Sequence, residues 1–150
     1  MLVEGLQAYI AGATTVTAVI GTPTSRTDSQ SGVFPTLATE SAPLPYIVFS
    51  QVAGAPTTTS MAGTNALQTE RWRFSCYGSK YKTAKQLAKI LKQALIDMDG
   101  LLPVGGAEIH GSWHVLEADD AESAGHGTIY ATHLDFEITY LDGDTTGRQA

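Results

Sequence analysis

The sequence of 150 residues has few of the features that mark several large classes of protein. Its single cysteine, Cys76, cannot form an internal disulfide, and one cysteine is too few for a zinc ribbon or finger. No apolar run reaches about 18 residues, so we expect no membrane-spanning helix. The first residues contain Glu4 and no basic segment, so we also expect no signal peptide.

Basic side chains are scarce as well. The formal net charge is -6 and the isoelectric point lies near 5.0, which argues against a general nucleic-acid binder, because such binding depends on neutralising phosphates. The hydrophobic fraction of 43% instead fits a globular chain with a core of its own. We therefore expect one domain over residues 1–141 and a flexible tail over residues 142–150.

The charges are unevenly distributed along the chain. Residues 1–79 are almost neutral, whereas residues 93–150 hold eleven acidic side chains and a single base, Arg148. All five lysines fall between Lys80 and Lys92. This segregation is typical of a solvated surface, or else of a self-complementary surface that suits head-to-tail contacts between the subunits of a ring.

Hydrophobic periodicity predicts two helices and four strands and leaves residues 14–20 ambiguous. Long polar stretches rich in Thr, Ser, Pro and Gly predict loops over residues 21–45 and 53–66. The expected fold class is α+β, with a mainly antiparallel four-stranded sheet, helices packed on one face and long loops. The predicted elements are helices over 2–11 and 80–98, and strands over 46–52, 67–77, 107–116 and 128–141.

The candidates for chemistry are few. Cys76 alternates with Trp72 and Phe74, which places it in the core and not in a reactive site. The sequence contains no nucleophile elbow and no phosphate-binding loop. Three histidines on predicted strands could together bind zinc, although surface histidines are the simpler interpretation; they are His110, His114 and His133. We predict no catalytic residue, no metal and no cofactor.

Two arginines stand out among the polar residues. Arg71 and Arg73 point to the outward face of the predicted strand 67–77. Arginine forms bidentate pairs with carboxylates and is enriched at protein interfaces, so both residues are candidates for a contact with a partner. A solvated strand face is the alternative interpretation.

Several features occur together in a recognisable order. The segments that carry the resemblance are Val19-Ile20-Gly21, Pro45-Tyr46-Ile47-Val48-Phe49, Val52-Ala53-Gly54, Arg71-Trp72-Arg73-Phe74-Ser75-Cys76-Tyr77, the helix from Tyr81 to Leu95, and Leu134-Asp135-Phe136-Glu137-Ile138-Thr139-Tyr140. In this order they resemble the tail completion proteins of tailed phages, also called tail terminator or tail-to-head joining proteins. The resemblance covers nearly the whole chain.

The resemblance implies a structural virion protein of the siphophage type and no enzyme. Such a protein would form a ring, usually a hexamer, that caps the tail tube and joins it to the head connector. Its partners would be copies of itself, the tail tube protein and the head-completion protein, with no membrane and no sequence-specific nucleic acid, although DNA would pass through the ring lumen. It would be assembled in the host cytoplasm and would lie at the head-proximal end of the phage tail.

Two groups of residues are predicted to form the contacts. The first pairs a lysine face with the acidic stretch of a neighbouring subunit; its members are Lys82, Lys85, Lys89 and Lys92 on one side, and Glu117, Asp119, Asp120 and Glu122 on the other. The second lies in the loop over 53–66 and would contact the tube or the connector; its members are Pro56, Thr57, Thr58, Thr59 and Met61. The alternatives are a stopper, adaptor or tube protein of the same particle, or a small metal-binding or ligand-binding enzyme domain that uses the histidines.

Overall fold

The computed structural model describes residues 2–21, 26, 30–38, 42–56, 67–104, 106–124 and 127–142. None of the helices in these ranges is long and apolar enough to span a membrane. The elements in chain order are α1 (Leu2–Gly12), α2 (Thr14–Ile20), β1 (Val33–Pro35), β2 (Tyr46–Pro56), β3 (Leu67–Gly78), α3 (Tyr81–Ile96), β4 (Gly100–Leu101), β5 (Ala107–Ala124) and β6 (Gly127–Asp142).

The strands form one six-stranded mixed sheet in the order β1-β2-β3-β6-β5-β4. β1 pairs in parallel with β2, and every other neighbouring pair is antiparallel. The predicted four-stranded, mainly antiparallel sheet is therefore wrong. β1 has three residues and β4 has two, so neither is long enough to show an alternating pattern, and β1 lies inside the segment predicted as a loop over 21–45.

β5 is also longer than the predicted strand 107–116. It continues through the acidic stretch to Ala124, and residues 116–124 all pair with β6. Acidic residues have low strand propensity, but the regular ladder with β6 pairs their backbone groups. Bulges at His110 and Val115 interrupt this ladder.

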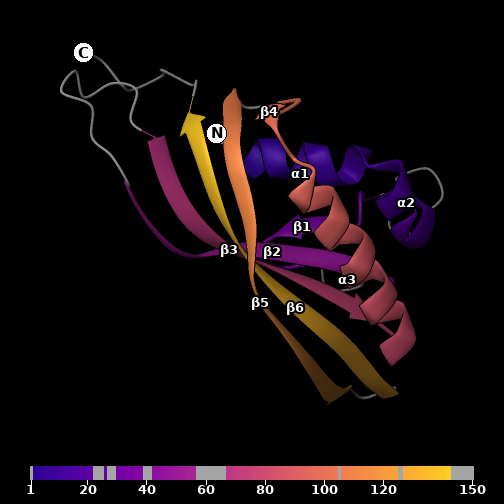
Figure 1. The fold of residues 1–150 in the computed structure, drawn as a ribbon. Coiled ribbons are helices and arrows are strands. Elements are labelled where there is room, and N and C mark those ends of the chain that lie inside the picture. The colour runs from indigo at the N-terminus through magenta and orange to yellow at the C-terminus, as the bar shows by residue number, and fades with distance from the viewer. Residues whose placement is uncertain are drawn as a thin grey trace.

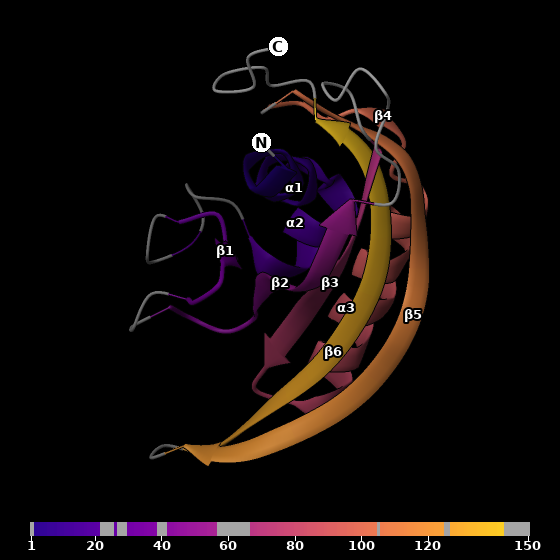
Figure 2. The same ribbon diagram turned by 90° about the vertical axis from the view of Figure 1, so that its left-hand side faces the viewer.

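The sheet is strongly curved and carries all three helices on one side. Figure 1 shows α1, α2 and α3 beside the sheet, and in Figure 2 the strands lie in front of α3. We call the side of the sheet that packs against the helices the helix face and the opposite side the bare face. Because strand residues alternate between these faces, each strand contributes to both.

The core lies between the helix face and the helices. Trp72, Phe74 and Cys76 alternate along β3 and are all buried, so the predicted core position of Cys76 is confirmed. The amphipathic stripe of α3 packs against them; its buried members are Ala84, Leu87, Ala88, Leu91 and Leu95. Each buried leucine contributes about 1.5–3 kcal/mol through removal of apolar surface from water. This core fixes α3 across the sheet and thereby positions its polar flank above β5.

Candidate functional site

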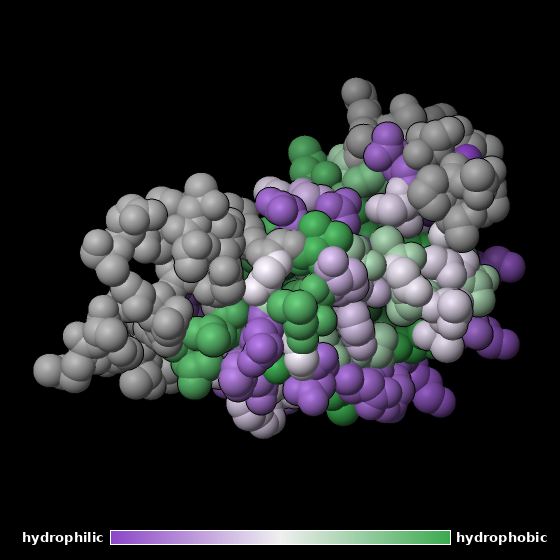
Figure 3. Space-filling view, turned by 90° about the horizontal axis from the view of Figure 1, so that it is seen from above, coloured by the Kyte–Doolittle hydropathy of each residue, from purple (hydrophilic) through white to green (hydrophobic). Residues whose placement is uncertain are grey.

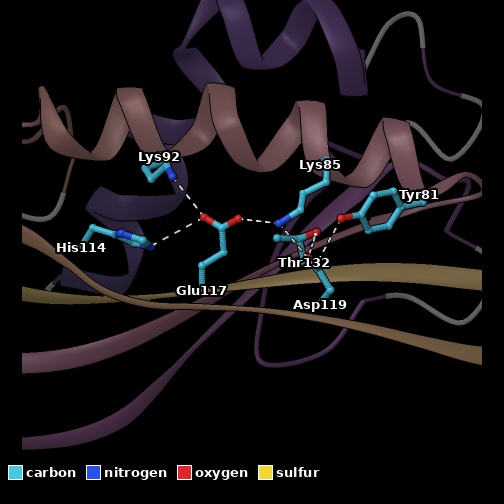
Figure 4. A network of polar contacts seen from close by, with 7 residues as sticks. All are labelled: Tyr81, Lys85, Lys92, His114, Glu117, Asp119 and Thr132. Atoms are coloured by element: carbon cyan, nitrogen blue, oxygen red, sulfur yellow. Dashed lines mark hydrogen bonds and ion pairs between the residues drawn. The ribbon is translucent and has the colours of Figure 1, made fainter.

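A polar network joins α3 to β5 on the helix face (Figure 4). The Nζ atom of Lys85 lies 2.5 Å from a carboxylate oxygen of Glu117 and 2.9 Å from one of Asp119. The Nζ atom of Lys92 lies 3.1 Å from the other oxygen of Glu117. His114 extends the network at 4.0 Å from Glu117. One acidic side chain thus bridges two lysines that lie two helical turns apart.

Asp119 has further hydrogen-bond donors. The Tyr81 hydroxyl donates to it at 3.0 Å and the Thr132 hydroxyl at 3.1 Å. Hydrogen bonds from lysines hold the pKa of Glu117 below its usual value, and the bond from Lys85 does the same for the pKa of Asp119. The carboxylates in turn raise the pKa of Lys85. These groups therefore stay charged over the physiological pH range.

The residues of the predicted lysine–acid contact divide into two groups. Two lysines, Lys85 and Lys92, and two acids, Glu117 and Asp119, pair inside one subunit. The other four side chains are exposed and have no ion pair within the part of the chain that the structure describes; they are Lys82, Lys89, Asp120 and Glu122. A contact with a neighbouring subunit stays a prediction, and these four residues are its remaining candidates.

Strand alternation separates the acids of β5 onto the two faces of the sheet. Asp119 pairs with Thr132 and reaches the helix face, where it meets Lys85. Asp120 pairs with Ala131 and Glu122 with Ile129, which places both on the bare face. The sequence alone showed a continuous acidic stretch, whereas the fold divides it between an internal network and an outer surface.

A second charged cluster lies on the bare face. Asp135 accepts hydrogen bonds from Arg71 at 2.9 Å and from Arg73 at 2.8 Å, and only 1% of its surface is exposed. The hydrogen bond from Arg73, reinforced by Arg71, holds the pKa of Asp135 below its usual range. The guanidinium-bearing side chains remain 35% and 44% exposed. The two arginines thus bind a carboxylate of their own chain, and the exposed Glu137 lies opposite Arg71 across the ladder.

The same face exposes large apolar side chains that the sequence analysis did not single out. Trp113 is 55% exposed and Leu116 is 45% exposed. They pair across the ladder with Glu137 and Asp135, so they belong to the bare face. A Cβ atom on Gly111 would lie 2.4 Å from the Trp113 ring, which shows that the indole covers this glycine. An exposed tryptophan on the same face as two partly exposed arginines is the composition of an interaction surface.

The histidines do not come together. His133 lies on the bare face, with its Nδ1 atom 2.7 Å from the Ser75 hydroxyl, whereas His114 contacts the ring of Phe136 on the helix face. His110 pairs with Glu108 at 2.9 Å. Among the described residues, no three His, Cys, Asp or Glu side chains are arranged to hold a metal ion.

The structure describes only one of the residues predicted to form the loop contact. Pro56 is the last residue of β2. The other members, Thr57, Thr58, Thr59 and Met61, lie outside the described residues, so their role stays a prediction.

The chain matches the model of a known protein family. The model of the family described as tail completion protein gp17 matches residues 4–141. The chain belongs to this family. The resemblance predicted from the sequence is confirmed, and this tail completion protein is a structural protein of the virion tail.

A solved structure shares the fold. One chain in the virion of a native gene transfer agent particle superposes with a TM-score of 0.59 at 19% sequence identity, and the match covers 91% of this chain and 93% of that one. None of the curated protein sequences matches significantly.

Proposed function

We propose that the tail completion protein forms a ring of identical subunits that closes the tail tube at its head-proximal end and joins it to the head connector. The observation that supports a ring is the asymmetry of the subunit. One lateral side carries a helix layer with exposed lysines, and the other is a bare sheet with exposed acids, arginines and tryptophan. Contacts between two unlike surfaces generate rings when the rotation closes.

One end of the subunit suits contacts along the tail axis. Residue pairings bring the end of β2, the start of β3 and the end of β6 to the end where β4 lies. Figure 3 looks onto this end and shows hydrophobic groups between hydrophilic ones. Among the large apolar residues of this part of the chain, Leu101 is 69% exposed and Val104 is 51% exposed. The connection over 57–66 starts and finishes here, so this end is our candidate for stacking on the tube or the connector.

The ring is tested with the purified protein. Multi-angle light scattering and negative-stain microscopy should show closed rings of about six subunits at micromolar concentration. A strict monomer at every concentration would contradict the proposal. Counting copies per particle by quantitative mass spectrometry separates the roles, because a terminator occurs as one ring whereas a tube protein repeats along the tail.

The joining role is tested by deleting the residues from Pro56 to Met61. The variant should fold and form rings, because the deletion leaves β3 and the core intact, but particles carrying it should accumulate as separate heads and tails. Deletion of residues 145–150, a segment of the same length beyond β6, is the matched control and should leave joining unchanged. Normal yields of joined particles with the first deletion would exclude this loop from the contact.

A further inference from the structure

We infer that the bare face of one subunit receives the exposed flank of α3 from a second copy, so that sheets and helix layers alternate around the ring. The inference rests on the proposed ring and names the surfaces that would build it. The contact would be heterologous, because the two surfaces belong to opposite sides of the subunit.

The first argument is the alignment of α3 with β5. The Tyr81 hydroxyl bonds to Asp119, and Lys92 bonds to Glu117, so the helix runs along the strand in the opposite direction. Lys82 therefore lies level with Asp120. Ile96 follows Lys92 by about one helical turn and lines the same hollow as Glu117, so it lies toward the end of α3 that faces the Trp113 side of β5.

The second argument is that two complementary pairs come into register together. In this proposal the ring axis runs along α3, as stacking at the end where β4 lies requires, so rotation about it moves a neighbour around the ring without shifting it along the helix. Lys82 of the neighbour then meets the acidic end of the bare face, formed by Asp120 and Glu122. The same rotation brings Ile96, which is 49% exposed, to Trp113 at the apolar end. Charge meets opposite charge and apolar surface meets apolar surface in one movement.

The third argument is a hollow beside α3. It is lined by Lys85, Lys89, Lys92, Gln93, Ile96 and Glu117. Long side chains of this kind offer apolar stems to an indole, and a lysine ammonium is attracted to its face. The indole of Trp113 in the next subunit packs over Gly111 of its own strand and stays 55% exposed, so it offers an apolar surface to such a site. Tryptophan in a central pocket is a frequent anchor of protein interfaces.

Charge also disfavours one symmetric alternative, the contact of two α3 flanks. Two α3 flanks in contact would bring lysine against lysine, because Lys82 and Lys89 are both exposed along the flank. Like charges in direct contact suppress wrong pairings. The surface therefore favours a contact between the α3 flank and the bare face over a two-fold contact between two α3 flanks.

Charge reversal provides the test. One variant carries Lys82→Glu and Lys89→Glu, and the other carries Asp120→Lys and Glu122→Lys. Each alone should need a protein concentration at least about tenfold higher for half-assembly, because both of its surfaces then carry the same sign. An equimolar mixture of the two should form rings again, with the variants alternating. Glu4→Lys, a charge reversal at an exposed position of α1, is the control and should assemble like the parent protein.

A further variant guards against a folding defect. Trp113→Ala removes a half-exposed side chain outside the core, so the far-ultraviolet circular dichroism spectrum should stay that of a folded protein while assembly weakens. Normal assembly of this variant, or a mixture of charge variants that fails to form rings, would overturn the inference. If the unaltered protein forms no ring at all, the proposed function fails. If it does form rings and charge reversal has no effect, only the interface assigned here fails.

Discussion

At the scale of single residues, the charged side chains divide into those that pair within the subunit and those that stay exposed on its surface. Asp135 is the clearest example, since it is almost fully buried on the bare face and is bound by Arg71 and Arg73. Arginines at this site hold a carboxylate as a pair, which orients both guanidinium groups toward the surface. The cluster therefore serves both the stability of the sheet and the shape of the bare face.

Replacement of Asp135 tests this role. Asp135→Asn should lower the free energy of unfolding by about 1–3 kcal/mol, less than for a fully buried pair because the arginines keep contact with water. Glu137→Gln removes an exposed carboxylate that lies opposite Arg71 but is not buried with it, and should change stability by no more than about 0.5 kcal/mol. Urea denaturation monitored by circular dichroism measures both. Equal changes in the free energy of unfolding for the two substitutions would show that the buried cluster stabilises the protein no more than an exposed carboxylate does.

At the scale of elements, α1 depends on a close approach that only glycine allows. A Cβ atom on Gly5 would lie 2.7 Å from a methyl carbon of Leu102 and 2.8 Å from the backbone oxygen of Val104. The helix thus packs directly on the segment between β4 and β5. Gly12, at the other end of the same helix, has nothing within 4 Å of such an atom.

These two glycines form a matched pair for mutation. Gly5→Ala should destabilise the protein by about 1–2 kcal/mol, because the steric cost exceeds the gain in helix propensity. Gly12→Ala should be neutral or stabilising by about 0.5 kcal/mol. Thermal unfolding of both variants distinguishes packing from propensity. A stabilised Gly5→Ala variant would mean that α1 does not rest on this segment.

At the scale of the whole molecule, both faces of the sheet respond to acid. The pKa values of Glu117 and Asp119 on the helix face and of Asp135 on the bare face are all lowered by hydrogen bonds from cationic partners. A carboxylate with a lowered pKa in the folded state stabilises the fold above its unfolded pKa and loses that contribution as the pH falls through its folded pKa.

The free energy of unfolding should therefore be nearly constant between about pH 5 and 7 and should fall below about pH 4. A variant with Glu117→Gln, Asp119→Asn and Asp135→Asn should be less stable at neutral pH and should show a shallower fall toward acid. Urea titrations across this range measure the slope. Identical slopes for the two proteins would assign the acid sensitivity to other carboxylates.

Local patterns were sufficient for much of this protein. The alternation along residues 67–77 predicted the strand and the buried position of Cys76, and the apolar stripe predicted α3. The order of such segments led to the family, because a family preserves the sequence of its elements. Arg71 and Arg73 were also identified correctly as residues of the outward strand face.

Only the tertiary structure decided the rest, because it depended on contacts between segments far apart in the chain. β1 and β4 are too short to carry a pattern and exist through their pairing with longer strands. The single acidic stretch became two surfaces, since strand pairing turns Asp119 toward α3 and Asp120 away from it. The sequence by itself determined the core and the family. The face of the sheet on which each charged side chain lies was decided by the tertiary structure, because it depends on how the strands pair.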